Sequence, residues 1–314
     1  MEHTFASQSV ITIEAAAEAW LAHLQTRRRR PIKPASVKTF RSYLDAHILP
    51  RLGQLEVGSV GVAVLRKFID ELDGAGLSAK SQVEITSCVK SIIASVCDAE
   101  GEPLYTRKWD NERLDLPLVN PAEQHTPIVT KEQIEAALQA SEEPHKYLYA
   151  LAAGSGLRIG ELLAIKLADD GACSYFDSEE ARIHVRQSVW RGELQAPKTL
   201  SAVRTVELPR DLGAMLVSFG GKRTGFMFGN GRRLSASTAR ENLAKHGISG
   251  FHSFRRFRAT TLLASRVPSV LTKYWLGHST HGDITEHYAN GGMTNDEGLR
   301  REWCERVGLG FKLP

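Results

Sequence analysis

No apolar run in this chain of 314 residues approaches the roughly 20 residues that would span a bilayer. The first residues also lack the basic-then-apolar layout of a secretory signal peptide. These absences predict a cytoplasmic protein that works without a membrane. The four cysteines are widely scattered, and no two of them form a CxxC pair. This spacing argues against a disulfide framework and favours free, buried thiols.

The chain also lacks a strong excess of charge of either sign. Its formal net charge is +4, which by itself does not indicate a nucleic-acid partner. One basic cluster stands out, because Arg27 to Arg30 form a block that Lys33, Lys38 and Arg41 extend. Such a cluster is the electrostatic footprint of phosphate contact, although a solvated loop between helices would have the same composition.

Helical spacing of apolar residues dominates the segment 11–99. In its first part, 11–26, Ile13, Ala17 and Leu21 share one face, and Thr12 stands where an N-cap is expected. Three further helices are predicted, over 36–48, 62–73 and 78–99. This part of the chain is therefore predicted to be entirely α-helical.

The sequence changes character at about residue 101. The stretch 101–127 contains four prolines and few periodic apolar residues, which is typical of a linker. We place the linker at 116–126, with one domain over 1–115 and a second over 127–314.

The second domain is predicted to be mostly helical with one small antiparallel sheet. Thr130 is expected to cap a helix over 131–141, and 158–167 is expected to form another. Three runs rich in Val, Ile and Thr are expected to be the strands: 173–177, 182–190 and 203–209. The remaining helices are expected near 145–154, 209–218, 235–245, 252–266, 268–276, 283–289 and 295–306.

Two arginines stand where a phosphate could be held. Arg158 opens a predicted helix, where a cation opposes the helix dipole unless it binds an anion; a surface salt bridge to Glu161 is the alternative. His252 and Arg255 are three residues apart and project from one face of a helix's first turn. A guanidinium grips phosphate oxygens with two parallel hydrogen bonds, but a basic, solvated helix would show the same pattern.

Histidines near the carboxyl end raise the question of a metal: His278, His281 and His287. No cysteine or carboxylate pair completes a four-ligand set with them. Four aspartates also form no obvious cluster: Asp169, Asp170, Asp177 and Asp283. We therefore expect a site without a metal.

The order of the motifs is more informative than any one of them. Alone, Tyr288 would be an ordinary aromatic residue and Lys198 a solvated lysine of a turn. However, GLRIGELLAIK, PKT, HSFRRFR, LGHS and then a tyrosine ten residues after that histidine resemble the tyrosine recombinase (phage integrase) family. The resemblance extends over residues 130–290. It assigns six catalytic residues: Arg158, Lys198, His252, Arg255, His278 and Tyr288.

This resemblance implies a mainly α protein with two domains. A helical (SAM-like) core-binding domain would precede a mixed α+β catalytic domain with a three-stranded antiparallel sheet. Tyr288 would attack a DNA phosphorus and form a 3′-phosphotyrosine. Arg158 and Arg255 would stabilise the developing charge, and His278 would give the phosphate one more hydrogen bond. His252 would accept a proton, and Lys198 would supply one.

The implied partner is double-stranded DNA, bound by a monomer that assembles into a homotetramer on paired sites, without a cofactor. Two alternatives stay open: a type IB topoisomerase, which shares the phosphotyrosine chemistry, and a catalytically silent DNA-binding protein of the same fold. Arg256, where the family frequently has histidine, is expected to point away from the site. The helix 295–306 is expected to dock either on a neighbouring protomer or on its own domain.

Overall fold

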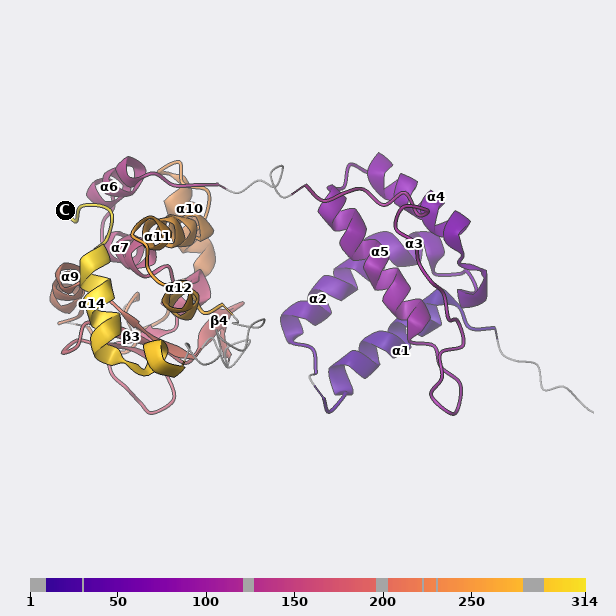
Figure 1. Cartoon of the computed structure of the whole chain (residues 1–314), viewed down its shortest axis with the longest axis horizontal. Helices are drawn as coiled ribbons and strands as arrows, with labels where there is room; N and C mark the ends of the chain where they lie inside the picture. The colour runs from indigo at the N-terminus through magenta and orange to yellow at the C-terminus, as the bar shows by residue number, and fades with distance from the viewer. Residues whose placement is uncertain are drawn as a thin grey trace, which may run out of the picture. The chain divides into compact units, whose positions relative to one another are not determined.

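The computed structural model describes residues 10–29, 31–120, 127–195, 203–221, 223–229, 231–278 and 291–314. The chain divides into two compact units, Met1–Gln124 and His125–Pro314, each with its own hydrophobic core (Figure 1). The predicted linker 116–126 contains the point of division. Within the described residues, no helix combines the length and apolarity needed to cross a membrane.

Within residues 10–99 of the described chain, the elements of the first unit are helices, as predicted. Helix α1 (Ile13–Thr26) starts where the Thr12 side chain accepts a hydrogen bond from the backbone N of Ala15. The second helix is longer than expected, because α2 (Pro34–Tyr43) continues as the π-helix η1 (Leu44–Ile48) and then α3 (Leu49–Leu52). The unit is completed by η2 (Val57–Ser59), α4 (Val62–Gly74) and α5 (Ala79–Ala94).

The proline-rich stretch is only partly a connector. Leu114 is fully buried in the core of the first unit, and Tyr105 and Trp109 pack against that core. Arg107 also donates hydrogen bonds to the carbonyls of Gly58 and Val60. These contacts hold residues 105–114 on the first unit, although these residues form no helix or strand.

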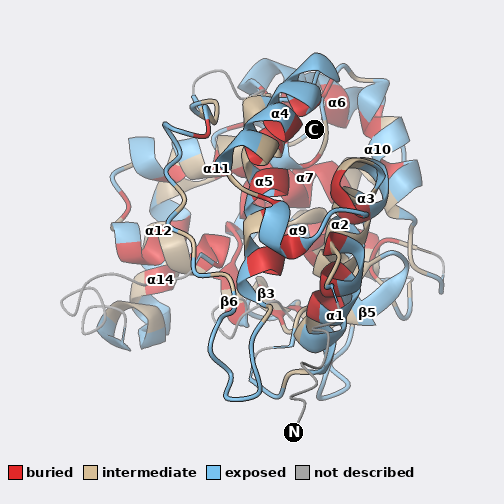
Figure 2. Cartoon of the chain, turned by 90° about the vertical axis from the view of Figure 1, so that its right-hand side faces the viewer, coloured by how far each residue is buried: buried red, intermediate tan, exposed pale blue. Residues whose placement is uncertain are grey.

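The second unit is built around helix α7 (His145–Ser155), which is buried along most of its length (Figure 2). Helix α6 (Lys131–Ala140) begins with the predicted cap, Thr130, which forms a capping box with Gln133. The other long helices are α9 (Arg210–Gly220), α10 (Ala236–Ala244), α11 (His252–Ala264), α12 (Ser269–Leu276) and α14 (Glu297–Val307).

The predicted sheet is present, with one strand that the sequence did not indicate. Among the described residues, the order is β1 (Ile165–Lys166), β2 (Ser174–Asp177), β3 (Arg182–Val185) and β6 (Arg204–Glu207). The last three strands pair antiparallel, as expected, whereas β1 pairs parallel with β2.

The helix predicted over 158–167 was wrong in its second half. Helix α8 (Ile159–Leu162) is short, and the chain then enters β1. A short apolar run fits a buried strand as well as a helix, so periodicity alone does not separate them. Here tertiary contacts decide, because the Ile165 carbonyl accepts a hydrogen bond from Met227 N while the residue pairs with Ser174.

The strand predicted over 182–190 is divided in two. The Ser174 hydroxyl accepts hydrogen bonds from the backbone N of Arg186 (2.9 Å) and of Gln187 (2.8 Å), which ends β3 at Val185. The chain then forms a separate hairpin of β4 (Ser188–Trp190) and β5 (Glu193–Gln195). The strand β5 lies between the predicted strands 182–190 and 203–209, where no strand was predicted.

Helix α14 packs on its own unit. Cys304, Leu309 and Phe311 are buried in the core of the second unit. The Arg258 guanidinium, itself buried, donates to the carbonyl of Gly308 at 2.6 Å, directly after the helix ends. Of the two arrangements expected for this helix, the structure has the docking within one chain.

Candidate active site

Arg158 is placed by the break between two helices. Helix α7 ends at Gly156, whose φ of +70° is a conformation that a glycine adopts readily. Two residues later, Arg158 has extended backbone and caps α8. Its side chain is 40% exposed, so it faces solvent while its base is fixed between two helices.

Glu161 is the anchor of this arginine. The carboxylate is buried and accepts hydrogen bonds from Arg158 through the backbone N (2.9 Å) and Nη1 (3.0 Å). It also accepts from Nη1 and Nη2 of Arg204 at 3.2 and 3.1 Å. Burial alone would raise the pKa of Glu161, but Arg204 and then Arg158 hold that pKa below its ordinary range. The pairing predicted for Glu161 is therefore buried and shared by two arginines.

Arg255 comes from the first turn of α11 and is almost completely buried. Its Nη1 donates to the carbonyl of Gly156 at 3.0 Å, and its Nη2 donates to the carbonyl of Leu276. Nη2 also lies 2.8 Å from Nε2 of His278. Burial, followed by the charge of Arg158, lowers the pKa of Arg255 to about 10. The buried, positive surroundings therefore disfavour the charge of this guanidinium, but with a pKa of about 10 it stays charged at neutral pH.

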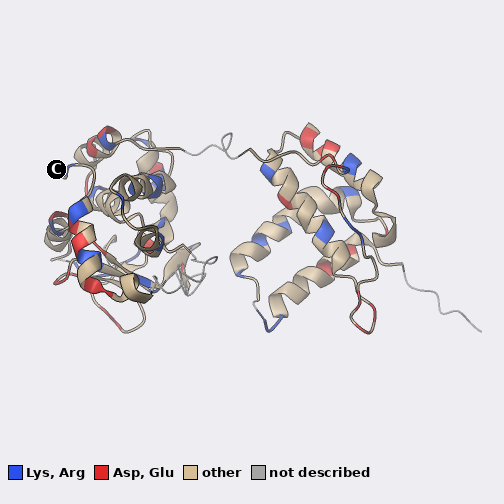
Figure 3. Cartoon of the chain, in the orientation of Figure 1, with Lys and Arg blue, Asp and Glu red and all other residues tan. Residues whose placement is uncertain are grey.

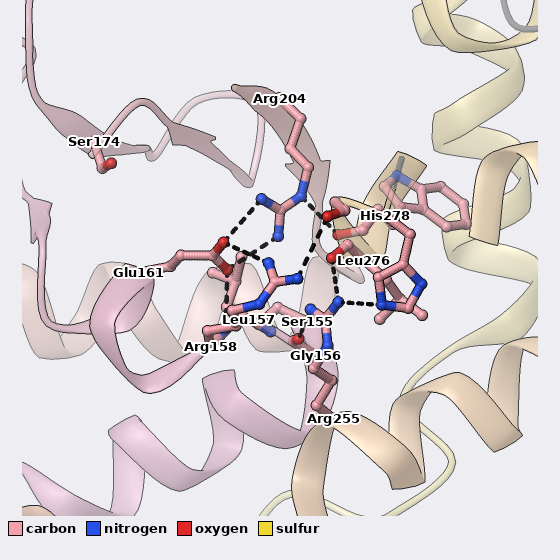
Figure 4. Close-up of polar contacts among 12 residues, drawn as sticks. Ser155, Gly156, Leu157, Arg158, Glu161, Ser174, Arg204, Arg255, Leu276 and His278 are labelled. Carbon is pink, nitrogen blue, oxygen red and sulfur yellow. Dashed lines mark hydrogen bonds and ion pairs between the residues drawn. The ribbon is translucent and has the colours of Figure 1, made fainter. Parts of the chain in front are cut away.

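The carboxyl end of α12 places partial negative charge beside these arginines. Three successive carbonyls each accept a hydrogen bond from a different arginine, as Figure 4 shows for this cluster. The donors are Nε of Arg204 to Trp275 (2.8 Å), Nη2 of Arg255 to Leu276, and Nη2 of Arg158 to Gly277 (3.4 Å). Because the carboxyl end of a helix carries partial negative charge, it stabilises cations gathered there.

Two histidines complete the described part of the site. Burial, followed by the charges of Arg256, Arg255 and Arg158, lowers the pKa of His252. Burial and then Arg255 lower the pKa of His278. Since a guanidinium can only donate, Nε2 of His278 must accept from Arg255, which leaves the proton of a neutral ring on Nδ1. Arg158 and His252 also line one cavity of about 380 Å³.

The structure therefore brings together four of the six residues named from the sequence: Arg158, His252, Arg255 and His278. They come from the α7–α8 junction, from α11 and from the residues that follow α12. Lys198 and Tyr288 lie outside the described residues. Arg256 points elsewhere, as expected, since its Nη1 donates to the carbonyl of Pro127 at 3.1 Å.

Arg204 is the residue that the sequence analysis missed. Its side chain has no exposed surface, and it links Glu161 to the end of α12. The signal was present, because residues two apart on a strand face the same side, and Val206 and Leu208 are apolar. Alternation thus places Arg204 on the buried face, where an arginine requires a partner.

The described residues also contain one close group of possible metal ligands, Asp169, Asp170 and Cys173. Of the four aspartates considered from the sequence, Asp169 and Asp170 thus lie together with Cys173, and Asp177 is not part of this group. Asp170 already accepts from Lys166 at 2.6 Å and from two backbone N–H groups, and Asp169 accepts from Arg186. These hydrogen bonds stabilise the turn before β2, and this role accounts for the two exposed carboxylates without a metal.

Comparison with known proteins identifies the family of the chain. The sequence profile of the phage integrase family matches residues 127–294, so the chain belongs to that family. It is 24% identical to a "Tyrosine recombinase XerC-like" protein of Caldanaerobacter subterraneus subsp. tengcongensis, over 86% of this chain and 76% of that protein. The protein is thus a tyrosine recombinase by family.

Solved structures share the fold. The Tn1549 transposon integrase in complex with transposon right end DNA is 19% identical, with a TM-score of 0.67 over 90% of this chain and 98% of the other. A λ integrase dimer bound to a COC′ core site is 16% identical, with a TM-score of 0.57 over 92% and 97%. The mainly helical fold predicted from the sequence is shared by these integrases.

Proposed function

We propose that this chain is a site-specific DNA recombinase that cuts and rejoins DNA by transesterification through a 3′-phosphotyrosine. The observation that carries the proposal is the convergence of Arg158, Arg255, His252 and His278 from segments far apart in the sequence. Attack of a side-chain hydroxyl on a phosphodiester requires stabilisation of the developing negative charge and a group that accepts a proton. Two guanidinium groups and two neutral imidazoles can supply these two functions.

The arginines would stabilise the charge of the phosphoryl transition state. Arg158 is the more available of the two, because among the described residues its Nη2 is held only by the 3.4 Å contact to the Gly277 carbonyl. Arg255 is buried, and its contacts to Gly156 and Leu276 orient it in advance. Donors that are fixed before the reaction require little reorganisation when charge develops. They would supply the charge stabilisation that a metal ion provides in other phosphoryl-transfer enzymes.

The proton transfers follow from the same residues. The Tyr288 oxygen would form a bond to phosphorus while the bond from phosphorus to the 5′ oxygen breaks. The phenol, with an ordinary pKa of ~10, would lose its proton to His252 during the attack. Lys198 would give a proton to the departing 5′ oxygen. The Nδ1–H group of His278 would donate to a non-bridging oxygen, since its Nε2 is occupied.

Double-stranded DNA is the proposed partner, and a tetramer on paired sites is the proposed assembly. A λ integrase tetramer has been solved on a Holliday junction, with a TM-score of 0.52 to this chain. In the first unit, the loop between α1 and α2 is basic and carries the exposed Arg28 and Arg29 (Figure 3). Exposed guanidinium groups on a loop suit contact with the phosphate backbone.

A nicked suicide substrate tests the chemistry directly. The expected product of the wild-type chain is a covalent protein–DNA band on a denaturing gel, with the nucleotide attached to Tyr288 by peptide mass spectrometry. Tyr288→Phe should abolish the band. Tyr274→Phe should still yield it, although more slowly, because the Tyr274 hydroxyl supports the end of α12 through the backbone N of Thr205 (3.1 Å) and is not the nucleophile. A band that persists in the Tyr288→Phe chain would overturn the assignment.

Two further measurements separate the alternatives. Recombination should require two copies of a specific site, whereas a type IB topoisomerase would relax supercoiled DNA that lacks them. Activity should survive EDTA, since no step is assigned to a metal. A chain that binds the site and never forms the covalent band would be a silent DNA-binding protein.

A further inference from the structure

A buried ion pair joins the C-terminal helix to the strand that carries Arg204. Nε of Arg300, on α14, donates to Oε1 of Glu207, on β6, at 2.8 Å. Both residues are at most 4% exposed, so neither can touch DNA. Two buried charges are stable only when each satisfies the other. The docking of α14 and the conformation of Glu207 therefore depend on each other.

The second oxygen of Glu207 continues this contact toward the active site. Oε2 accepts a hydrogen bond from Nε1 of Trp275 at 2.7 Å, and Trp275 is in the last turn of α12. The carbonyl of the same tryptophan accepts from Nε of Arg204 at 2.8 Å. Trp275 is thus held at both its ring and its backbone by residues of β6.

A third contact also holds the end of α12 against β6. The backbone N of Thr205, between Arg204 and Glu207 on β6, donates to the hydroxyl of Tyr274 at 3.1 Å. The guanidinium of Arg300 lies over the Tyr274 ring, 5.4 Å from its centroid. The strand β6 therefore sets how far the end of α12 extends and which way it is rotated.

The end of α12 is where the catalytic arginines are held. The carbonyls that follow Trp275 accept from Arg255 and Arg158, and His278 lies against Arg255. A rotation of this turn would move the Leu276 and Gly277 carbonyls together with the His278 ring. Displacements on the order of 1 Å can cost an enzyme about a hundredfold in rate.

We propose that Glu207, held by Arg300, is a positioning residue for DNA strand cleavage: through Trp275 it fixes the turn that orients Arg158, Arg255 and His278. The inference rests on the proposed function for its rate measurement. On this proposal, α14 does more than cover the core, because its Arg300 helps to position the residues of the active site. The path is Arg300 to Glu207 to the Trp275 ring, and then along the α12 backbone to the three residues of the site.

Two variants break the path in different ways. Trp275→Phe removes the donor and leaves the ion pair, whereas Glu207→Leu with Arg300→Met removes the acceptor without leaving an unpaired charge. Both should lower the single-turnover rate of covalent complex formation at saturating DNA on the order of tenfold, with DNA affinity within about twofold. Glu207→Gln keeps an oxygen for Trp275 and should recover most of the rate.

Arg301→Met is the matched control. Arg301 is also on α14, but it donates to the carbonyls of Leu208 and Glu180 and not to Glu207. It should lower the melting temperature to a similar extent and leave the cleavage rate unchanged. Path variants that cleave at the wild-type rate, or a control that loses as much rate, would overturn the proposal.

The ring titration of His278, followed by NMR in the free protein, gives a readout that needs no DNA. Burial and then Arg255 lower the pKa of His278, so in Trp275→Phe this pKa should move part of the way toward its ordinary value, because Arg255 no longer lies against Nε2. In Arg301→Met it should not move. An unchanged titration in Trp275→Phe overturns the positioning role. A wild-type chain that forms no covalent complex would instead refute the proposed function, and the titration would still decide the positioning.

Discussion

Gly277 and Arg204 fit together so closely that no side chain has room between them. A Cβ atom on Gly277 would lie 2.8 Å from Nη1 of Arg204 and 2.9 Å from its Cζ. Gly277 also has a φ of +62°, which disfavours any residue with a side chain. The glycine of the LGH motif is therefore required twice, once by the backbone that ends α12 and once by the buried guanidinium.

Gly277→Ala should consequently displace Arg204 and the turn before His278. The backbone strain costs about 1–2 kcal/mol, and the contact adds to it. Gly247→Ala is the matched control, since Gly247 in the same unit has a φ of +70° with nothing within 4 Å of an added Cβ. Chemical denaturation should show a larger loss for Gly277→Ala, and cleavage should fail only there. Equal losses and equal cleavage would contradict the close fit.

Glu161→Gln should destabilise the second unit strongly. The change leaves Arg204 buried opposite a neutral amide, and breaking a buried pair costs about 3–5 kcal/mol. Glu18→Gln on α1 is the comparison, because Glu18 and Arg41 form an exposed pair worth about 0–1 kcal/mol. Denaturant titrations that resolve the two units would measure both. Similar small effects would mean that the Arg204–Glu161 contact contributes little.

The candidate site could be predicted from the sequence where residue type and spacing determine the chemistry. His252 and Arg255 needed only the helical repeat to be placed on one face, and Arg158 needed only the helix break at Gly156. The meeting of these segments was not readable from spacing, because it depends on the carbonyls at the end of α12. The family resemblance supplied that step.

Arg204 shows what the sequence analysis left out. Alternation along β6 placed it on a buried face, yet an arginine in a strand is usually taken as solvent-exposed. Its partners, Glu161 and the Trp275 carbonyl, lie 43 and 71 residues away along the chain. The same limit applies to β1, whose backbone partners come from other segments.

The pH dependence of cleavage should reflect the lowered pKa of His252. A neutral base is needed, and an ordinary histidine begins to lose that form below a pH of ~6.5. Because burial and then Arg256 lower the pKa of His252, the rate should stay on its plateau to a more acidic pH. Arg256→Met removes one cause, so its acid limb should move back toward higher pH. Rate profiles with the same acid limb in both proteins would exclude His252 as the base.

Stability should depend on acid in the same direction. His252 and His278 both have folded pKa values below their unfolded values, so the unfolded chain binds more protons as the pH falls. Their contribution to stability is complete above a pH of ~6.5 and is lost as the pH falls through the lowered folded pKa values. Denaturation between pH 7 and 5 measures this, and a double His→Gln variant should flatten the dependence.

Arg255→Lys should slow cleavage far more than it weakens DNA binding. A lysine cannot contact Gly156, Leu276 and a phosphate at once, whereas the guanidinium has donors on two sides. The loss of one fixed donor costs on the order of a hundredfold or more in rate. Arg256→Lys is the neighbouring control, since Arg256 contacts the Pro127 carbonyl. Equal rates for the two variants would remove Arg255 from the proposed transition-state contacts.

The basic loop of the first unit should contribute to DNA affinity without determining which DNA sequence is bound. Arg28 and Arg29 are exposed between α1 and α2, and each phosphate that a cation neutralises contributes about 0.9 to the slope of log K against log salt. Arg28→Ala with Arg29→Ala should therefore weaken binding to specific and random duplexes alike and reduce the slope by about 1–2.

Arg66→Ala with Lys67→Ala removes the same charge from α4 and should leave the slope nearly unchanged. Fluorescence anisotropy across a salt series measures both slopes. If the two double variants lose the same amount, overall charge explains the effect and the loop is not a phosphate contact.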